Sequence, residues 1–106
     1  MQKRELFRLR IDRTGRIKRG VETRLCQVVN LTENGFRLQL EGFFAPGEIL
    51  RLEFLLSEED LLACTVQVIY ARPPFVGVAI AGISHCHQKT LSHFIDQVNI
   101  LNMTGC

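Results

Sequence analysis

Hydrophobic and polar residues alternate along most of the chain, and this alternation predicts β-strands because successive side chains of a strand point to opposite faces. The pattern is clearest in residues 50–56, where Leu50, Leu52, Phe54 and Leu56 share one face. Six such segments follow one another, at about residues 9–18, 23–31, 35–40, 50–56, 61–72 and 75–83. The chain is therefore expected to be mainly β.

Glycine, proline and polar clusters mark the turns between these segments. Ala45-Pro46-Gly47 and Ser57-Glu58-Glu59-Asp60 separate neighbouring strands, and Pro73-Pro74 ends the long fifth segment. Gly20 is placed to turn the chain into the second strand. Gly15 is expected to mark a bulge or bend in the first strand.

The alternation also assigns side chains to the core. Cys64, Val66, Val68 and Tyr70 fall on one face of the fifth segment and are expected to be buried together. Gly77, in the last segment, indicates close packing within a curved sheet. Most of the seven Phe side chains and the single Tyr fall on predicted core faces, which leaves no exposed aromatic platform for a nucleic-acid strand.

After the sixth segment the hydrophobic period changes from two to about 3.6 residues, which predicts an amphipathic helix from about residue 86 to 101, fraying after that. The apolar stripe consists of Leu91, Phe94, Ile95 and Val98. Ser84 is the expected N-cap. Six strands followed by one helix predict a small six-stranded antiparallel β-barrel over residues 10–83, with the C-terminal helix packed over it.

Length and composition place this barrel in a single globular domain of residues 1–106. The apolar fraction is 46% and the charged fraction is 23%, as in ordinary globular proteins. No apolar run approaches the roughly 18 residues of a membrane span, so direct membrane insertion is not expected. Residues 1–5 are polar and precede no apolar segment of a secretory signal, which predicts a cytoplasmic location.

Charge is distributed unevenly. Residues 1–24 hold nine Lys/Arg and three Asp/Glu, a balance of +6, whereas the other 82 residues hold four Lys/Arg and eight Asp/Glu, a balance of −4. A basic N-terminal segment on a mildly acidic body indicates an anionic partner that binds at this end. A phosphate ligand, a nucleic acid and an acidic protein surface all satisfy this condition.

Two short motifs indicate which chemical groups the anionic partner carries. Arg4 and Arg8 are four residues apart in the basic arm, residues 1–9, and a guanidinium pairs with phosphate, stacks on bases and matches the O6/N7 edge of guanine. Asn30 and Thr32 lie two apart in an extended segment, so their side chains share a face. Gly35 is suited to the following turn because it reaches φ > 0 without a Cβ clash.

These residues resemble the two motifs of the PilZ domain family, a bacterial module that binds cyclic di-GMP. The RxxxR motif reads Arg4-Glu5-Leu6-Phe7-Arg8, and the [D/N]xSxxG motif reads Asn30-Leu31-Thr32-Glu33-Asn34-Gly35. The resemblance extends from about residue 3 to 98, and the family's six-stranded barrel with a C-terminal helix agrees with the periodicity. Thr32 departs from the family, which usually has Ser there.

The resemblance implies a non-enzymatic receptor that binds cyclic di-GMP and presents a changed surface to a downstream protein partner. It assigns Arg4 and Arg8 to guanine and phosphate, and Asn30 and Thr32 to a guanine edge. Lys3 and Arg10 are additional candidates for the same site. Thr32 keeps the hydroxyl but stiffens χ1, which we expect to weaken binding modestly or leave it unchanged.

Catalytic residues, bound metals and cofactors are not expected. Glu58, Glu59 and Asp60 form a turn and not a positioned acid/base pair. The consecutive residues His85-Cys86-His87 have poor geometry for one tetrahedral ion. The spacing of the four cysteines matches no zinc or redox motif, which predicts reduced structural thiols.

Two other functions remain open. The first is a degenerate PilZ barrel that has lost the ligand and acts as a protein–protein adaptor, with Thr32 as its sequence hint. The second and weaker one is a nucleic-acid binder that uses the basic arm. The predicted burial of the aromatic side chains argues against this second reading, so no nucleic acid is expected as a partner.

Overall fold

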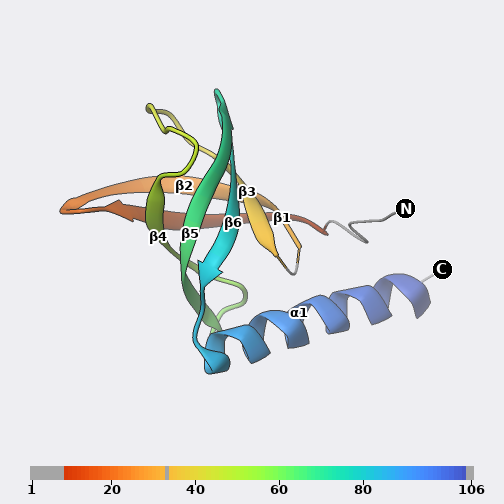
Figure 1. Cartoon of the computed structure of the whole chain (residues 1–106). Helices are drawn as coiled ribbons and strands as arrows, with labels where there is room; N and C mark the ends of the chain where they lie inside the picture. Colours follow the sequence, from red (N-terminus) through yellow and green to blue (C-terminus); the bar gives the residue numbers. More distant parts are fainter. Residues whose placement is uncertain (1–8, 33, 105–106) are drawn as a thin grey trace, which may run out of the picture.

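The structure, a computed structural model, describes residues 9–32 and 34–104. Six antiparallel strands close into a barrel in the order β1-β2-β3-β6-β5-β4, and one helix follows them (Figure 1). The elements are β1 (Leu9–Arg19), β2 (Glu22–Leu31), β3 (Gly35–Gln39), β4 (Ile49–Leu55), β5 (Leu61–Arg72), β6 (Phe75–Gly82) and α1 (His85–Thr104). The predicted fold class, strand number and C-terminal helix are confirmed.

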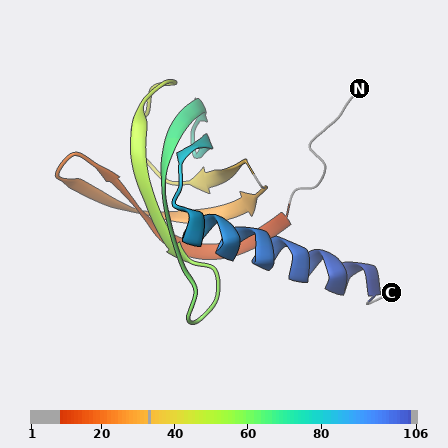
Figure 2. The same cartoon turned by 60° about the horizontal axis from the view of Figure 1, so that its bottom comes forward.

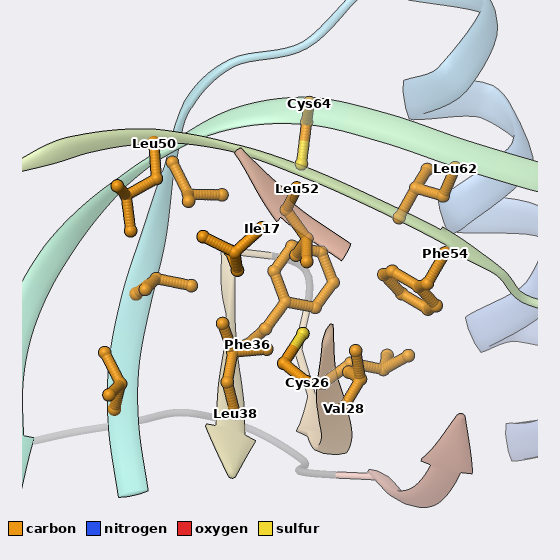
Figure 3. Close-up of a cluster of buried hydrophobic side chains, with 14 of the residues drawn as sticks. Ile17, Cys26, Val28, Phe36, Leu38, Leu50, Leu52, Phe54, Leu62 and Cys64 are labelled. Carbon is orange, nitrogen blue, oxygen red and sulfur yellow. The ribbon is translucent and has the colours of Figure 1, made fainter. Parts of the chain in front are cut away.

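The inward faces of the strands form one hydrophobic core (Figure 3). Leu52 and Val66 are completely buried, and the Phe36 and Phe54 rings meet edge to face with centroids 5.5 Å apart. Burial of so much apolar surface is the main stabilising contribution to a small barrel. Closure also leaves the sheet without a free edge.

Gly15 does not form the bulge that was predicted for the first strand. It pairs regularly with Cys26 and with Phe54, and the irregularity of β1 lies nearer the N-terminus, between Arg10 and Arg13. A Cβ at Gly15 would lie 3.0 Å from the Phe54 Cβ. Glycine fits here without displacing its neighbours, whereas a Cβ would press tightly on β4.

Helix α1 lies along one end of the barrel, and its C-terminal turns extend beyond the strands (Figures 1 and 2). Leu91 and Ile95 are buried against the core, as the predicted apolar stripe requires. Ser84 caps the helix, because its Oγ accepts a hydrogen bond from the His87 N–H at 3.3 Å. The helix continues to Thr104, three residues past its expected end.

The end of β1 is tied to the loop before β4. Arg19 Nη1 donates to Glu48 Oε2 at 2.9 Å, and its guanidinium lies 4.6 Å from the centroid of the buried Phe44 ring. Hydrogen bonds from the Ala45 N–H and from Arg19 lower the pKa of Glu48. Phe43, in contrast, is 82% exposed and is an exception to the expectation that most aromatic side chains lie on core faces.

Candidate functional site

A row of outward-facing residues crosses five neighbouring strands and includes Asn30, the first residue of the second sequence motif. Its members are Arg10, Asn30, Arg37, Gly77 and Tyr70, on β1, β2, β3, β6 and β5 in turn. Each residue is the Cα partner of the next across the sheet. The row therefore brings two guanidinium groups, one amide and one phenol ring onto a single outer face of the barrel.

A β-bulge places Asn30 in this row. Val28 pairs with Leu38 and Asn30 pairs with Arg37, so Val29 is an extra residue in β2. Strict alternation after Val28 would point Asn30 into the core. The bulge instead leaves Asn30 outside, because it shifts the alternation by one residue.

A second bulge, at Ile69 in β5, places Tyr70 in the same row. Val68 pairs with Val78, whereas Tyr70 pairs with Gly77. The prediction that Tyr70 lies in the core with Val68 is therefore wrong, and its side chain is 39% exposed. Its ring lies against Gly77, where a Cβ would overlap it.

Thr32 organises the turn that follows β2. Its backbone N–H donates to the Gly35 carbonyl at 3.0 Å. Its Oγ1 accepts hydrogen bonds from the N–H groups of Asn34 at 3.1 Å and Gly35 at 3.2 Å. The turn is anchored to β6, because the Asn34 carbonyl accepts from the Ile80 N–H at 2.8 Å. The hydroxyl group, which threonine and serine have in common, thus stabilises this turn by accepting two backbone hydrogen bonds.

Gly35 is required for a different reason from the one predicted. The glycines with positive φ among the described residues are Gly20, Gly42 and Gly47, and Gly35 is not one of them. A Cβ at Gly35 would instead overlap the carbonyl oxygen of Val78 on β6. Glycine is needed because β3 and β6 approach each other closely at the start of β3.

Two neighbouring hollows meet along the row. A hollow of about 260 Å³ lies beside the turn, and its wall includes Asn30, Arg37 and Tyr70. A second, of about 600 Å³, is lined by Asn30 and Arg37 from the other side and by Arg10 and Phe75. Asn30 and Arg37 therefore border both hollows.

Arg37 is a residue of this site that the sequence prediction missed. Its guanidinium carbon lies 4.3 Å from the centroid of the Phe75 ring. Its Nε is buried and has no hydrogen-bond partner among the described residues. The position of Arg37 between the inward-facing Phe36 and Leu38 was a usable signal, because it marks an outward residue two positions after the motif glycine.

The candidates Lys3, Arg4 and Arg8 lie outside the described residues, so the structure does not place them. Arg8 is followed directly by Leu9, which pairs with Leu31 at the end of β2. The first motif therefore joins the barrel beside the strand end that carries the second motif. Arg10, the other additional candidate, is exposed and lies next to Asn30 in the row.

Other chemistry has little support in the described part of the chain. No three His, Cys, Asp or Glu side chains there lie close enough to hold a metal ion. Burial raises the pKa of the Cys26 and Cys64 thiols to about 11, so both are protonated and unreactive at neutral pH. In residues 9–32 and 34–104, no helix is both long and apolar enough to span a membrane.

A closed six-stranded barrel with a polar row and a glycine turn on its outer face defines a small binding module. The family model of the PilZ domain matches residues 2–97, and the chain belongs to this family. The matched range includes positions 4–8 and 30–35. A search of curated proteins finds no relative.

Solved structures with a similar fold include three bacterial proteins. The Bacillus subtilis inhibitor of motility (MotI/DgrA) is 22% identical, with a TM-score of 0.74 over 93% of this chain and 53% of its own. MrkH of K. pneumonia in its apo state is 14% identical, with a TM-score of 0.78 over 100% of this chain and 56% of its own. The Legionella uncharacterized protein Lpg0364 is 13% identical, with a TM-score of 0.58 over 92% of this chain and 99% of its own.

At these identities the likeness concerns the fold. The chain spans about half the length of MotI/DgrA and of MrkH, so each of those proteins contains a further part that this chain does not match.

Proposed function

We propose that this PilZ domain is a receptor for cyclic di-GMP and not an enzyme. The observation that carries the proposal is the outer row, in which Asn30 stands between Arg10 and Arg37 beside the turn of Thr32 and Gly35. The family resemblance supplies the identity of the ligand, and the row supplies groups that suit it.

The chemistry of the ligand matches the groups on this face. Cyclic di-GMP carries two phosphates and two guanines, and arginine binds both phosphate and the O6/N7 edge of guanine with paired hydrogen bonds. The amide of Asn30 can donate and accept at a base edge. The exposed ring of Tyr70 borders the smaller hollow and offers a stacking surface. Arg4 and Arg8 would complete the site from the N-terminal segment.

Ligand binding would change the surface of the domain through the N-terminal segment, residues 1–8. We infer that Arg4 and Arg8 contact the ligand while it rests on the barrel face, so that the ligand links residues 1–8 to the row. Contacts that exist only in the bound state shift the population toward that state and alter the surface beside β2. A downstream protein would recognise the altered surface.

Isothermal titration calorimetry of cyclic di-GMP into the purified protein, with GTP and GMP as controls, tests the proposal. We expect a dissociation constant in the micromolar range or tighter, which corresponds to about 8 kcal/mol. Arg8→Ala should weaken binding by about tenfold or more, because a charge-assisted contact is lost. Arg51→Ala is the matched control, since Arg51 is an exposed arginine on β4, across the barrel from β3.

Absence of binding by the folded parent would refute the receptor function. It would favour the protein–protein adaptor, and partner capture would then be the next experiment. Parent-like affinity of Arg8→Ala would show that the first motif is misassigned while the receptor function stands.

A further inference from the structure

Arg37 has a property that folding alone does not explain. A buried donor without a partner is unfavourable and uncommon in proteins, yet the Nε–H of Arg37 has none among the described residues. Arg13 and Arg19 differ, because each donates to a protein oxygen, the Leu56 carbonyl and the Glu48 carboxylate respectively. Arg37, in the middle of the row, thus has a buried side-chain donor that no described residue uses.

The Arg37 guanidinium lies over the Phe75 ring, a position in which a guanidinium can stack on the aromatic face. The guanidinium carbon is 4.3 Å from the ring centroid, a distance typical of stacking. A stacked guanidinium keeps its N–H groups in the plane and directed away from the ring. Arg37 therefore offers an oriented fork of donors, which loses little side-chain freedom when a ligand binds.

The neighbours of Arg37 in the row suit a purine base. Gly77 lies directly opposite Arg37 on β6, and the Tyr70 ring lies against Gly77. A base stacked on the Tyr70 ring would direct one edge along the row toward Arg37. Asn30 lies on the other side of Arg37 and borders the same hollow.

We propose, on the basis of the proposed function, that Arg37 reads one guanine of the cyclic dinucleotide. Its guanidinium donates two parallel hydrogen bonds to O6 and N7 of the base. Adenine carries an amino group in place of O6, so the same fork discriminates against adenine. Arg37, supported by Phe75, is thus the specificity-determining residue of the barrel face.

Dissociation constants for cyclic di-GMP and cyclic di-AMP, measured on four proteins, test this inference. The proteins are the parent, Arg37→Gln, Arg37→Lys and the control Arg51→Gln. Glutamine pairs with the N6/N7 edge of adenine. We therefore expect Arg37→Gln to weaken cyclic di-GMP binding by about tenfold or more and to reduce the preference for guanine by a similar factor. Arg51→Gln should behave as the parent.

Arg37→Lys keeps the charge but not the fork, so it should also lose about tenfold in affinity for cyclic di-GMP with an unchanged melting temperature. This variant carries the test if Arg37→Gln does not fold. Phe75→Leu should weaken cyclic di-GMP binding more when it is introduced into the parent than when it is introduced into the Arg37→Lys variant. The reason is that the ring acts by orienting the guanidinium, which Arg37→Lys lacks.

The possible failures are distinguishable. A parent that binds cyclic di-GMP, together with Arg37 variants of equal affinity, overturns the role of Arg37 and leaves the receptor function intact. If the Arg37 variants lose the same factor of affinity for cyclic di-GMP and for cyclic di-AMP, Arg37 does not recognise guanine, because its contact with the ligand does not depend on the base. A folded parent that binds neither dinucleotide overturns the receptor function and this inference together.

Discussion

Thr32 shows how one hydroxyl group holds the glycine turn of the site. Its Oγ1 accepts from the N–H groups of Asn34 and Gly35, and serine could accept the same two hydrogen bonds. The substitution of Thr for the usual Ser therefore preserves the function of the hydroxyl in the turn. The added methyl group is the remaining difference between the two side chains.

Thr32→Val is expected to lower the free energy of unfolding by about 1 kcal/mol, because the part-buried Gly35 N–H loses its acceptor, whereas the exposed Asn34 N–H can bond to water instead. It should also weaken cyclic di-GMP binding, since the turn borders the smaller hollow. Urea unfolding and calorimetry measure the two effects. Thr32→Ser is the matched control and should stay close to the parent in both. A valine variant as stable as the parent would contradict the role assigned to the hydroxyl.

The buried thiols of Cys26 and Cys64 predict a loss of stability at high pH. Burial raises their pKa from 9.0 to about 11, whereas the unfolded chain ionises near the ordinary value. Between about pH 9 and 11 the unfolded state binds fewer protons than the folded state, so the free energy of unfolding falls as pH rises. Each thiol contributes a slope of up to about 1.4 kcal/mol per pH unit.

Urea unfolding at pH 8, 9 and 10 under reducing conditions measures this slope. Because lysine and tyrosine also titrate in this range, the comparison is with Cys64→Ala, which should show a shallower decrease. Identical slopes for the parent and the alanine variant would refute the contribution of the buried thiol.

Among the elements, the strands and the helix were largely predictable, because their hydrophobic periods are strong. The β-bulges were not. The sequence of residues 26–31 does not reveal that the alternation shifts at Val29, since the shift depends on how a neighbouring strand pairs and how the barrel curves. The same is true of Ile69, and for this reason Tyr70 was wrongly assigned to the core.

The close approach of β3 and β6 predicts the effect of a methyl group at the motif glycine. Gly35→Ala should lower the free energy of unfolding by about 2 kcal/mol or more, because the new Cβ would overlap the Val78 carbonyl oxygen and force the strands apart. Gly82→Ala is the control within β6, since its Cβ would make an ordinary contact of 3.8 Å with Thr65. Thermal unfolding compares the two variants, and equal stability would contradict the close approach.

For the whole molecule, the sequence motifs name part of the candidate site, and strand pairing brings further residues beside them. Asn30, Thr32 and Gly35 were identified because they lie close together in sequence. Arg37 and Tyr70 join them only through strand pairing across β3, β6 and β5, which no local pattern encodes. The described part of the candidate site is therefore a property of the closed barrel and not of one local segment.

A ligand that joins the N-terminal segment to the barrel should stabilise the folded chain as a unit. At a concentration of cyclic di-GMP 100 times its dissociation constant, the stabilisation is about 2.7 kcal/mol. For a domain of this size we expect the melting temperature to rise by about 10 °C. Differential scanning fluorimetry measures the shift. With the expected tenfold or greater loss of affinity, Arg8→Ala should show about half this shift or less at the same ligand concentration, and Arg51→Ala should retain the full shift. If all three proteins shifted equally, the ligand would be held by the barrel alone, and the N-terminal segment would have no part in the response.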